Sequence, residues 1–87
     1  MPYAVDFKPS AVDALRRLPR QVQVRIVAKA EALADNPRPS GCRKLAGAED
    51  LYRVRVGDYR IVYAIRDAVL TVLVVRIGHR REVYRDR

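Results

Sequence analysis

The stretch LYRVRVGDYRIVYAI, which runs from Leu51 to Ile65, carries the clearest structural signal in this chain of 87 residues. Apolar and basic side chains alternate from Leu51 to Val56, which is the period of a half-buried β-strand. Gly57-Asp58 then supplies residues that tolerate a positive φ, as a tight hairpin requires. The alternation resumes from Tyr59 to Arg66, so the stretch predicts two antiparallel strands.

The extended pattern continues towards the C-terminus. Asp67-Ala68 predicts a second turn, and Val69 to Ile77 predicts a third strand. That strand is apolar on both faces, which is typical of a strand covered on both sides, so we expect it to lie centrally in the sheet.

The N-terminal half begins with a strand and then changes to a helical period. Tyr3 to Phe7 alternates and predicts a short opening strand. Ser10 is a candidate N-cap for a helix that continues to about residue 17. A second helix is predicted from about Pro19 to Ala34 and ends before Asn36-Pro37, because a residue that precedes proline is pushed out of the α region. Its apolar face consists of Val22, Ile26, Ala30 and Leu33.

These elements predict an α+β fold in the order βααβββ, followed by a short C-terminal tail. Two N-terminal helices should pack on one face of a small, mainly antiparallel sheet, and the opposite face should be partly polar. We expect residues 1–87 to form a single domain, since this length is near the lower limit for a chain that buries its own core.

Arginine dominates the charge of the chain. The 18 Lys and Arg residues outnumber the 10 Asp and Glu residues, and 15 of the 18 are arginine. Most of the excess lies after residue 37. Guanidinium groups match the geometry of phosphates, so this bias favours an anionic partner. A genome rich in G and C would also enrich arginine codons, so the positions of the arginines have to decide between the two explanations.

The cysteine content and the apolar segments indicate where the protein works. A lone cysteine, Cys42, excludes an intramolecular disulfide and a multi-cysteine metal site, and it suits a reducing compartment. The first residues lack the pattern of a secretion signal, and no apolar stretch approaches the roughly 20 residues of a membrane span. We therefore expect a cytoplasmic protein that does not contact a membrane.

Three arginines are predicted to converge on the polar face of the hairpin. Arg53 and Arg55 project from the same side of one strand, and hairpin pairing can bring Arg60 beside them. The facing positions of the next strand are Val62 and Ala64, so no acid close in sequence neutralises the three charges. The cluster favours a phosphate-binding site. The alternative is that each arginine belongs to an ordinary solvated sheet face.

A second polar group follows the third strand, and it consists of His79, Arg80, Arg81 and Tyr84. Histidine titrates near neutrality and could take part in proton transfer, although a lone histidine is often only a surface residue. Tyr84 could stack on an exposed RNA base, and packing at the edge of the core is the alternative.

The run LYRVRVGDYRIVYAI, followed after a turn by LTVLVVRIGHRREVY, resembles the C-terminal half of RelE-type toxins from toxin–antitoxin pairs. With KLAG, from Lys44 to Gly47, and the two preceding helices, the resemblance covers essentially the whole chain. It implies a ribosome-dependent endoribonuclease that cleaves messenger RNA in the A site by attack of a 2′-hydroxyl, with no metal and no cofactor. It also implies a hetero-oligomer with an antitoxin, which the charge of this chain predicts to be acidic.

The site positions of the family fall on Arg53, Arg55, Arg60, Arg80 and Tyr84. Better-studied members have lysine at the first two positions, where this chain has arginine. The pKa of arginine, above about 12, keeps it protonated, so these two residues are expected to act through charge and not as a base.

The resemblance also implies a role for each residue. Arg55 and Arg60 are expected to stabilise the scissile phosphate, and Arg53 to hold the neighbouring backbone. Arg80 is expected to stabilise the leaving oxygen, and Tyr84 to stack on or orient a base. Two further residues are expected to contact the substrate: His79 and Arg81. The general base stays open.

Two other functions compete with this one. ParE-type toxins share the fold and much of the hydrophobic pattern, and they act on DNA gyrase without cutting RNA. The complete set of basic residues and the C-terminal tyrosine favours RNA cleavage, because a gyrase inhibitor has no chemical need for it. A plain nucleic-acid-binding module, or a toxin that has lost its catalysis, is the third possibility.

Overall fold

The computed structural model describes residues 2–47 and 50–79, and its main element is a sheet. Within this part of the chain the sheet has five strands in the order β1-β5-β4-β3-β2. Their bounds are β1 Ala4–Phe7, β2 Arg43–Lys44, β3 Leu51–Val56, β4 Tyr59–Arg66 and β5 Thr71–His79. β1 pairs with β5 in parallel, and the other neighbours are antiparallel. β5 therefore lies between two strands, as its apolar sequence predicts.

The β3–β4 hairpin has the predicted register. Val56 pairs with Tyr59, which leaves Gly57-Asp58 as a two-residue turn. Gly57 has a φ of +60°, whereas Asp58 is not among the residues with a positive φ, and this is the φ pattern of a type II′ turn. A type II′ turn matches the twist of the strands it joins, so the turn fixes which residues of β3 and β4 face each other.

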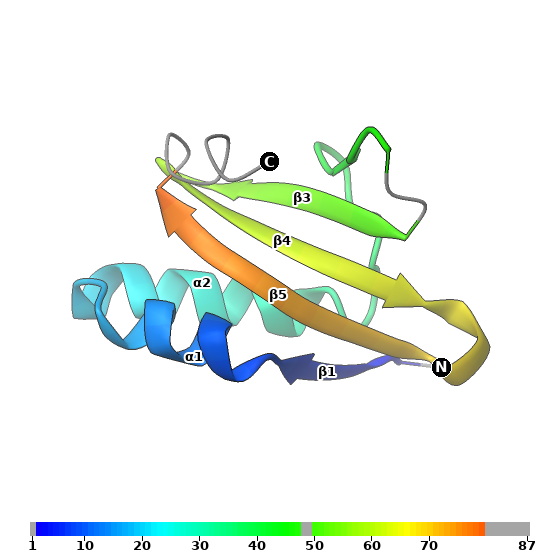
Figure 1. Cartoon of the computed structure of the whole chain (residues 1–87), viewed down its shortest axis with the longest axis horizontal. Coiled ribbons are helices and arrows are strands. Elements are labelled where there is room, and N and C mark those ends of the chain that lie inside the picture. Colours follow the sequence, from blue (N-terminus) through cyan, green and yellow to red (C-terminus); the bar gives the residue numbers. More distant parts are fainter. Residues whose placement is uncertain (1, 48–49, 80–87) are drawn as a thin grey trace.

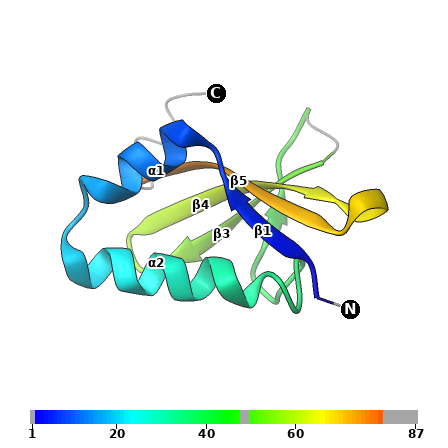
Figure 2. The same ribbon diagram turned by 90° about the horizontal axis from the view of Figure 1, so that it is seen from below.

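The two helices are α1 (Pro9–Arg16) and α2 (Arg20–Ala32), and both lie on the same side of the sheet (Figures 1 and 2). This arrangement confirms the predicted α+β architecture. The prediction that Ser10 caps α1 is wrong, because Lys8 is the N-cap and Pro9 begins the helix. Proline suits the first helical position, because a backbone N–H at that position would have no acceptor within the helix. None of the helices described is long and apolar enough to cross a membrane.

The core lies between the helices and one face of the sheet. The predicted apolar face of α2 is confirmed, since Ile26, Ala30 and Leu33 are all buried and Val22 packs against them. The sheet contributes alternate residues from its strands: Val54, Val56, Ile61, Tyr63, Ile65, Val72, Val74 and Ile77. Each fully buried residue of this size contributes on the order of 1.5–3 kcal/mol, so this one-sided core holds the helices to the sheet.

The start of β5 differs from the prediction. A strand was expected from Val69, but Asp67–Val69 forms one turn of 3-10 helix, and Leu70 follows with a left-handed φ of 49°. The strand therefore begins at Thr71 and continues to His79, two residues beyond the predicted end. The turn between β4 and β5 is therefore longer than the predicted Asp67-Ala68. Val69 and Leu70 are apolar, and apolar content alone does not distinguish the end of a turn from the start of a strand.

A β-bulge interrupts the pairing of β4 with β5. Val62 pairs with Arg76, whereas Tyr63 pairs with Val74, so β5 has one extra residue, Val75. The extra residue shifts the side chains that follow it to the opposite face. As a result Val74 and Ile77 both point into the core, although strict alternation would place them on opposite faces.

The loop after α2 is tied to the sheet by tyrosine and arginine side chains. The buried Tyr63 hydroxyl donates a hydrogen bond of 2.8 Å to the carbonyl of Pro37. Arg38 pairs with Asp67 at 2.9 Å and lies over the ring of Tyr52, 5.3 Å from its centroid. The Tyr3 hydroxyl also donates to Asp67, so this carboxylate joins the residue before β1, the loop and the β4–β5 turn.

We predict that Tyr63→Phe lowers the free energy of unfolding by about 1 kcal/mol, because the buried carbonyl of Pro37 loses its donor. Tyr52→Phe is the matched control, since its hydroxyl is exposed and accepts only a 3.3 Å hydrogen bond from Arg38. Urea unfolding of both variants measures the difference. An equal loss for the two variants would contradict a special role for the buried hydrogen bond.

The Arg38 and Tyr3 hydrogen bonds lower the pKa of Asp67 below its usual value of 3.8. A carboxylate whose folded-state pKa is depressed stabilises the fold above its unfolded-state pKa, and this contribution disappears as the pH falls through the folded-state pKa. The melting temperatures of the wild type and Asp67→Asn should therefore differ at neutral pH and converge below pH 3.8. Asp13→Asn is the matched control, because Asp13 is exposed on α1, and its melting temperature should equal that of the wild type at neutral pH.

Candidate functional site

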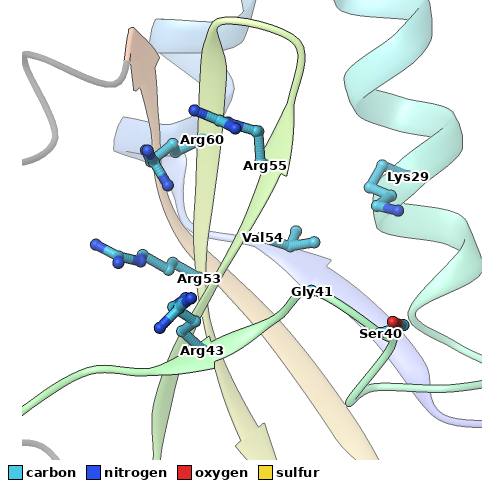
Figure 3. A pocket seen from close by; sticks show the side chains of 8 residues that line it. All are labelled: Lys29, Ser40, Gly41, Arg43, Arg53, Val54, Arg55 and Arg60. Atoms are coloured by element: carbon cyan, nitrogen blue, oxygen red, sulfur yellow. The ribbon is translucent and has the colours of Figure 1, made fainter.

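Four arginines gather on the face of the sheet that the helices leave open. Arg55 of β3 pairs directly with Arg60 of β4, and one step along the sheet Arg43 of β2 pairs with Arg53 of β3. Directly paired residues share a face, so the four side chains project together, as Figure 3 shows. We call Arg43, Arg53, Arg55 and Arg60 the arginine cluster. The predicted convergence of the hairpin arginines is thus present in the structure.

The arginine cluster lines a groove of about 550 Å³. The remaining lining residues are Lys29, Ser40, Gly41 and Val54. In Figure 3 the arginines extend to one side of the hairpin, while Val54 points towards α2 and Lys29. The groove therefore passes around the edge of β3, from the open face of the sheet towards the helix layer.

The electrostatics of the groove favour an anion. Like charges that face each other across a strand pair destabilise a sheet, and the arginine cluster contains two such pairs. The described residues that line the groove include five cations and no acid. The Nε atoms of Arg53 and Arg60 are shielded from solvent, so the stems of these two side chains lie against the protein. The groove thus presents closely spaced guanidinium groups, which suit a ligand with several phosphates.

The chemistry of the lining is that of anion binding. Guanidinium and ammonium groups donate hydrogen bonds and do not ligate metals. Within the described part of the chain, no group of three or more His, Cys, Asp or Glu side chains is placed to hold a metal ion.

Sequence reasoning missed three basic residues near the site. Arg43 lies on β2, a strand of two residues whose register with β3 is not visible in the sequence. Lys29 comes from α2 and reaches the groove only because the helix packs beside the sheet. Arg76 pairs with Val62, and Val62 with Arg53, so all three share the open face of the sheet. Strict alternation along β5 would have placed Arg76 in the core, and the bulge at Val75 reverses that.

The structure does not bring His79 to the arginine cluster. His79 pairs with Tyr59 and contacts its ring edge to face, with the centroids 5.6 Å apart. Tyr59 packs against the core, so His79 lies on the helix side of the sheet. The same bulge explains this placement, because it reverses the faces of all later residues of β5. The other predicted site residues of the tail lie outside the described residues: Arg80, Arg81 and Tyr84.

Comparison with known proteins identifies the family. Residues 5–84 match the model of the ParE toxin of type II toxin–antitoxin systems, parDE. Toxin RelG of Mycobacterium tuberculosis is 36% identical to the chain, over 98% of this chain and 99% of the relative. The mRNA interferase toxin RelE of Escherichia coli is 31% identical, over 99% of this chain and 94% of the relative.

A solved structure agrees with these matches. The toxin–antitoxin complex RelBE2 from Mycobacterium tuberculosis contains a chain that superposes with a TM-score of 0.82. The two chains are 30% identical, and the match covers 92% of this chain and 100% of the other. The fold, the family model and the relatives agree, so this chain belongs to the RelE/ParE superfamily of type II toxins and is a toxin of the RelE type.

Proposed function

We propose that this toxin is an endoribonuclease that cleaves messenger RNA in the ribosomal A site. The observation that carries this proposal is the direct pairing of Arg55 with Arg60 in the groove. Two guanidinium groups held opposite each other on a hairpin can both donate to one phosphate and stabilise the charge that it gains. The relative named mRNA interferase toxin RelE supports this reaction.

The proposed reaction is an in-line attack on the phosphorus by the adjacent 2′-hydroxyl oxygen. The bond from O2′ to phosphorus forms, the bond from phosphorus to O5′ breaks, and the products are a 2′,3′-cyclic phosphate and a 5′-hydroxyl. Arg55 and Arg60 stabilise the negative charge that develops on the pentacoordinate phosphorus. Arginine stays protonated at neutral pH, so the 2′-hydroxyl loses its proton to a base other than these arginines. The leaving O5′ takes up one proton to give the 5′-hydroxyl, so no net proton is gained or lost.

The other predicted residues have supporting roles in this proposal. Arg53, next to Arg55 on the open face, holds the neighbouring phosphate. Arg80 stabilises the leaving O5′, Arg81 contacts the RNA backbone and Tyr84 stacks on a base, as the family resemblance implies. His79 has no part in the proposed chemistry, because its ring lies against Tyr59 on the helix side.

Inhibition of DNA gyrase is the second candidate function, because the family model that this chain matches is that of the ParE toxin. The groove favours RNA cleavage, because a protein that only binds gyrase has no need for opposed arginines. Growth arrest on induction should be accompanied by cleavage of translated messages, which mapping of RNA 5′ ends would detect. Intact messages together with gyrase-dependent DNA breaks would replace our proposal with the gyrase one.

An acidic antitoxin is the proposed protein partner. The complex RelBE2 is a toxin–antitoxin assembly, and the net charge of this chain is +8. We propose that a largely helical acidic segment of the antitoxin covers the toxin in a hetero-oligomer. Co-purification with the product of the neighbouring gene tests this partner, and a toxin that is harmless when expressed alone would contradict it.

We predict that Arg55→Ala separates activity from stability. Single-turnover cleavage on stalled ribosomes should fall by about 10²-fold or more, because a preorganised cation is removed from the transition state. The free energy of unfolding should stay constant or rise by about 0.2–1 kcal/mol, since the repulsion with Arg60 is relieved. Arg60→Ala should lose activity to a similar degree.

Arg16→Ala is the matched control for these variants, because Arg16 is an exposed arginine at the end of α1 and lies outside the groove. It should retain wild-type cleavage. Full activity in both Arg55→Ala and Arg60→Ala, with unchanged melting curves, would overturn the catalytic assignment.

A further inference from the structure

The groove extends beyond the residues assigned to cleavage. One edge of β3 pairs with β4 along its whole length. On the other edge β2 pairs with β3 at Tyr52 and Arg53, and the Leu45 N–H donates to the Leu51 carbonyl. In the described part of the chain no strand pairs with this second edge from residue 54 to residue 56. At this open edge the groove passes Val54 and reaches Ser40 and Gly41 of the loop after α2 (Figure 3). A ligand that occupies the arginine cluster can therefore continue around the edge of β3.

Two cations along this path have no role in the proposed chemistry. Arg43 is exposed and lies opposite Arg53, at the start of the turn around the edge. Lys29 is partly buried on α2 and lines the far side of the groove. With respect to the described residues, neither side chain makes a hydrogen bond or an ion pair. Within residues 2–47 and 50–79, two cations from separate elements thus line one groove without a hydrogen-bond or ion-pair partner.

We infer that Arg43 and Lys29 bind two backbone phosphates of a single-stranded RNA that continues from Arg55 and Arg60 over the edge of β3. This inference rests on the proposed function, because an RNA whose scissile phosphate lies between Arg55 and Arg60 must continue beyond it. Gly41 lines the groove, and a Cβ at that position would meet nothing within 4 Å. The backbone of an RNA strand repeats its charge at every nucleotide, which matches cations placed along a path.

The first test measures binding without cleavage. The probe is a fluorescent single-stranded RNA oligonucleotide methylated on every 2′-oxygen, which removes the nucleophile. Each phosphate contact to single-stranded RNA contributes about 0.7 to the slope of log K against log salt concentration. For the double variant Lys29→Ala/Arg43→Ala the slope should therefore be smaller by about 1.4, and the affinity at low salt should fall.

The control removes the same charge from other surfaces. Arg16→Ala/Arg20→Ala replaces two exposed arginines of α1 and α2 that do not line the groove, and it should leave the slope unchanged. Equal slopes for the two double variants would overturn the inference. So would a double variant that retains its affinity for the RNA and loses affinity only for an acidic antitoxin peptide, because the groove would then be a peptide site.

The second test separates binding from chemistry. On ribosomes, the double variant Lys29→Ala/Arg43→Ala should need more toxin for half-maximal cleavage, while its single-turnover rate at saturation stays at the wild-type value. A lower rate at saturation with unchanged half-saturation would overturn the inference. A wild-type chain that binds the probe through Arg43 and Lys29 but leaves messages intact would instead refute the proposed cleavage alone.

Discussion

The register of the β3–β4 hairpin is the constraint on which the rest of the structure depends. A slip of one residue would turn Val54 and Ile61 towards solvent and bury arginines under the helices, because side chains alternate between the two faces. Each buried aliphatic side chain contributes on the order of 1.5–3 kcal/mol, whereas a pair of opposed like charges costs only about 0.2–1 kcal/mol. The core on one face therefore determines where the arginines lie on the other, and it does so at a small loss of stability.

The parts of the fold that sequence patterns predict are those in which neighbours along the chain decide the conformation. The hairpin and the apolar face of α2 are of this kind, since Gly57 and the spacing of Ile26, Ala30 and Leu33 act locally. The two-residue strand β2 is not, because its two residues become a strand only by pairing with β3. The 3-10 turn before β5 is also missed, since its apolar residues have the composition of a strand.

The candidate site divides in the same way. The three hairpin arginines could be found because one turn brings them together, and nothing beyond two adjacent strands is needed. Arg43 and Lys29 come from elements that meet the hairpin only through tertiary packing. The bulge at Val75 has the largest effect on a single residue, because it turns His79 away from the open face. A bulge of this kind leaves no periodic signal, since a β5 sequence that is apolar on both faces fits either alternation.

The open edge of β3 has a consequence for the solubility of the protein. An unpaired strand edge can pair with the same edge of another copy, and proteins commonly prevent this with charged side chains. Arg43 and Arg55 flank the edge, so two copies that approach each other along β3 repel. Once an anionic ligand neutralises these charges, the repulsion between copies is lost. A ligand that neutralises the arginines and keeps the protein in solution must therefore also cover the strand edge. The area that such a ligand covers has to include both the arginines and this edge.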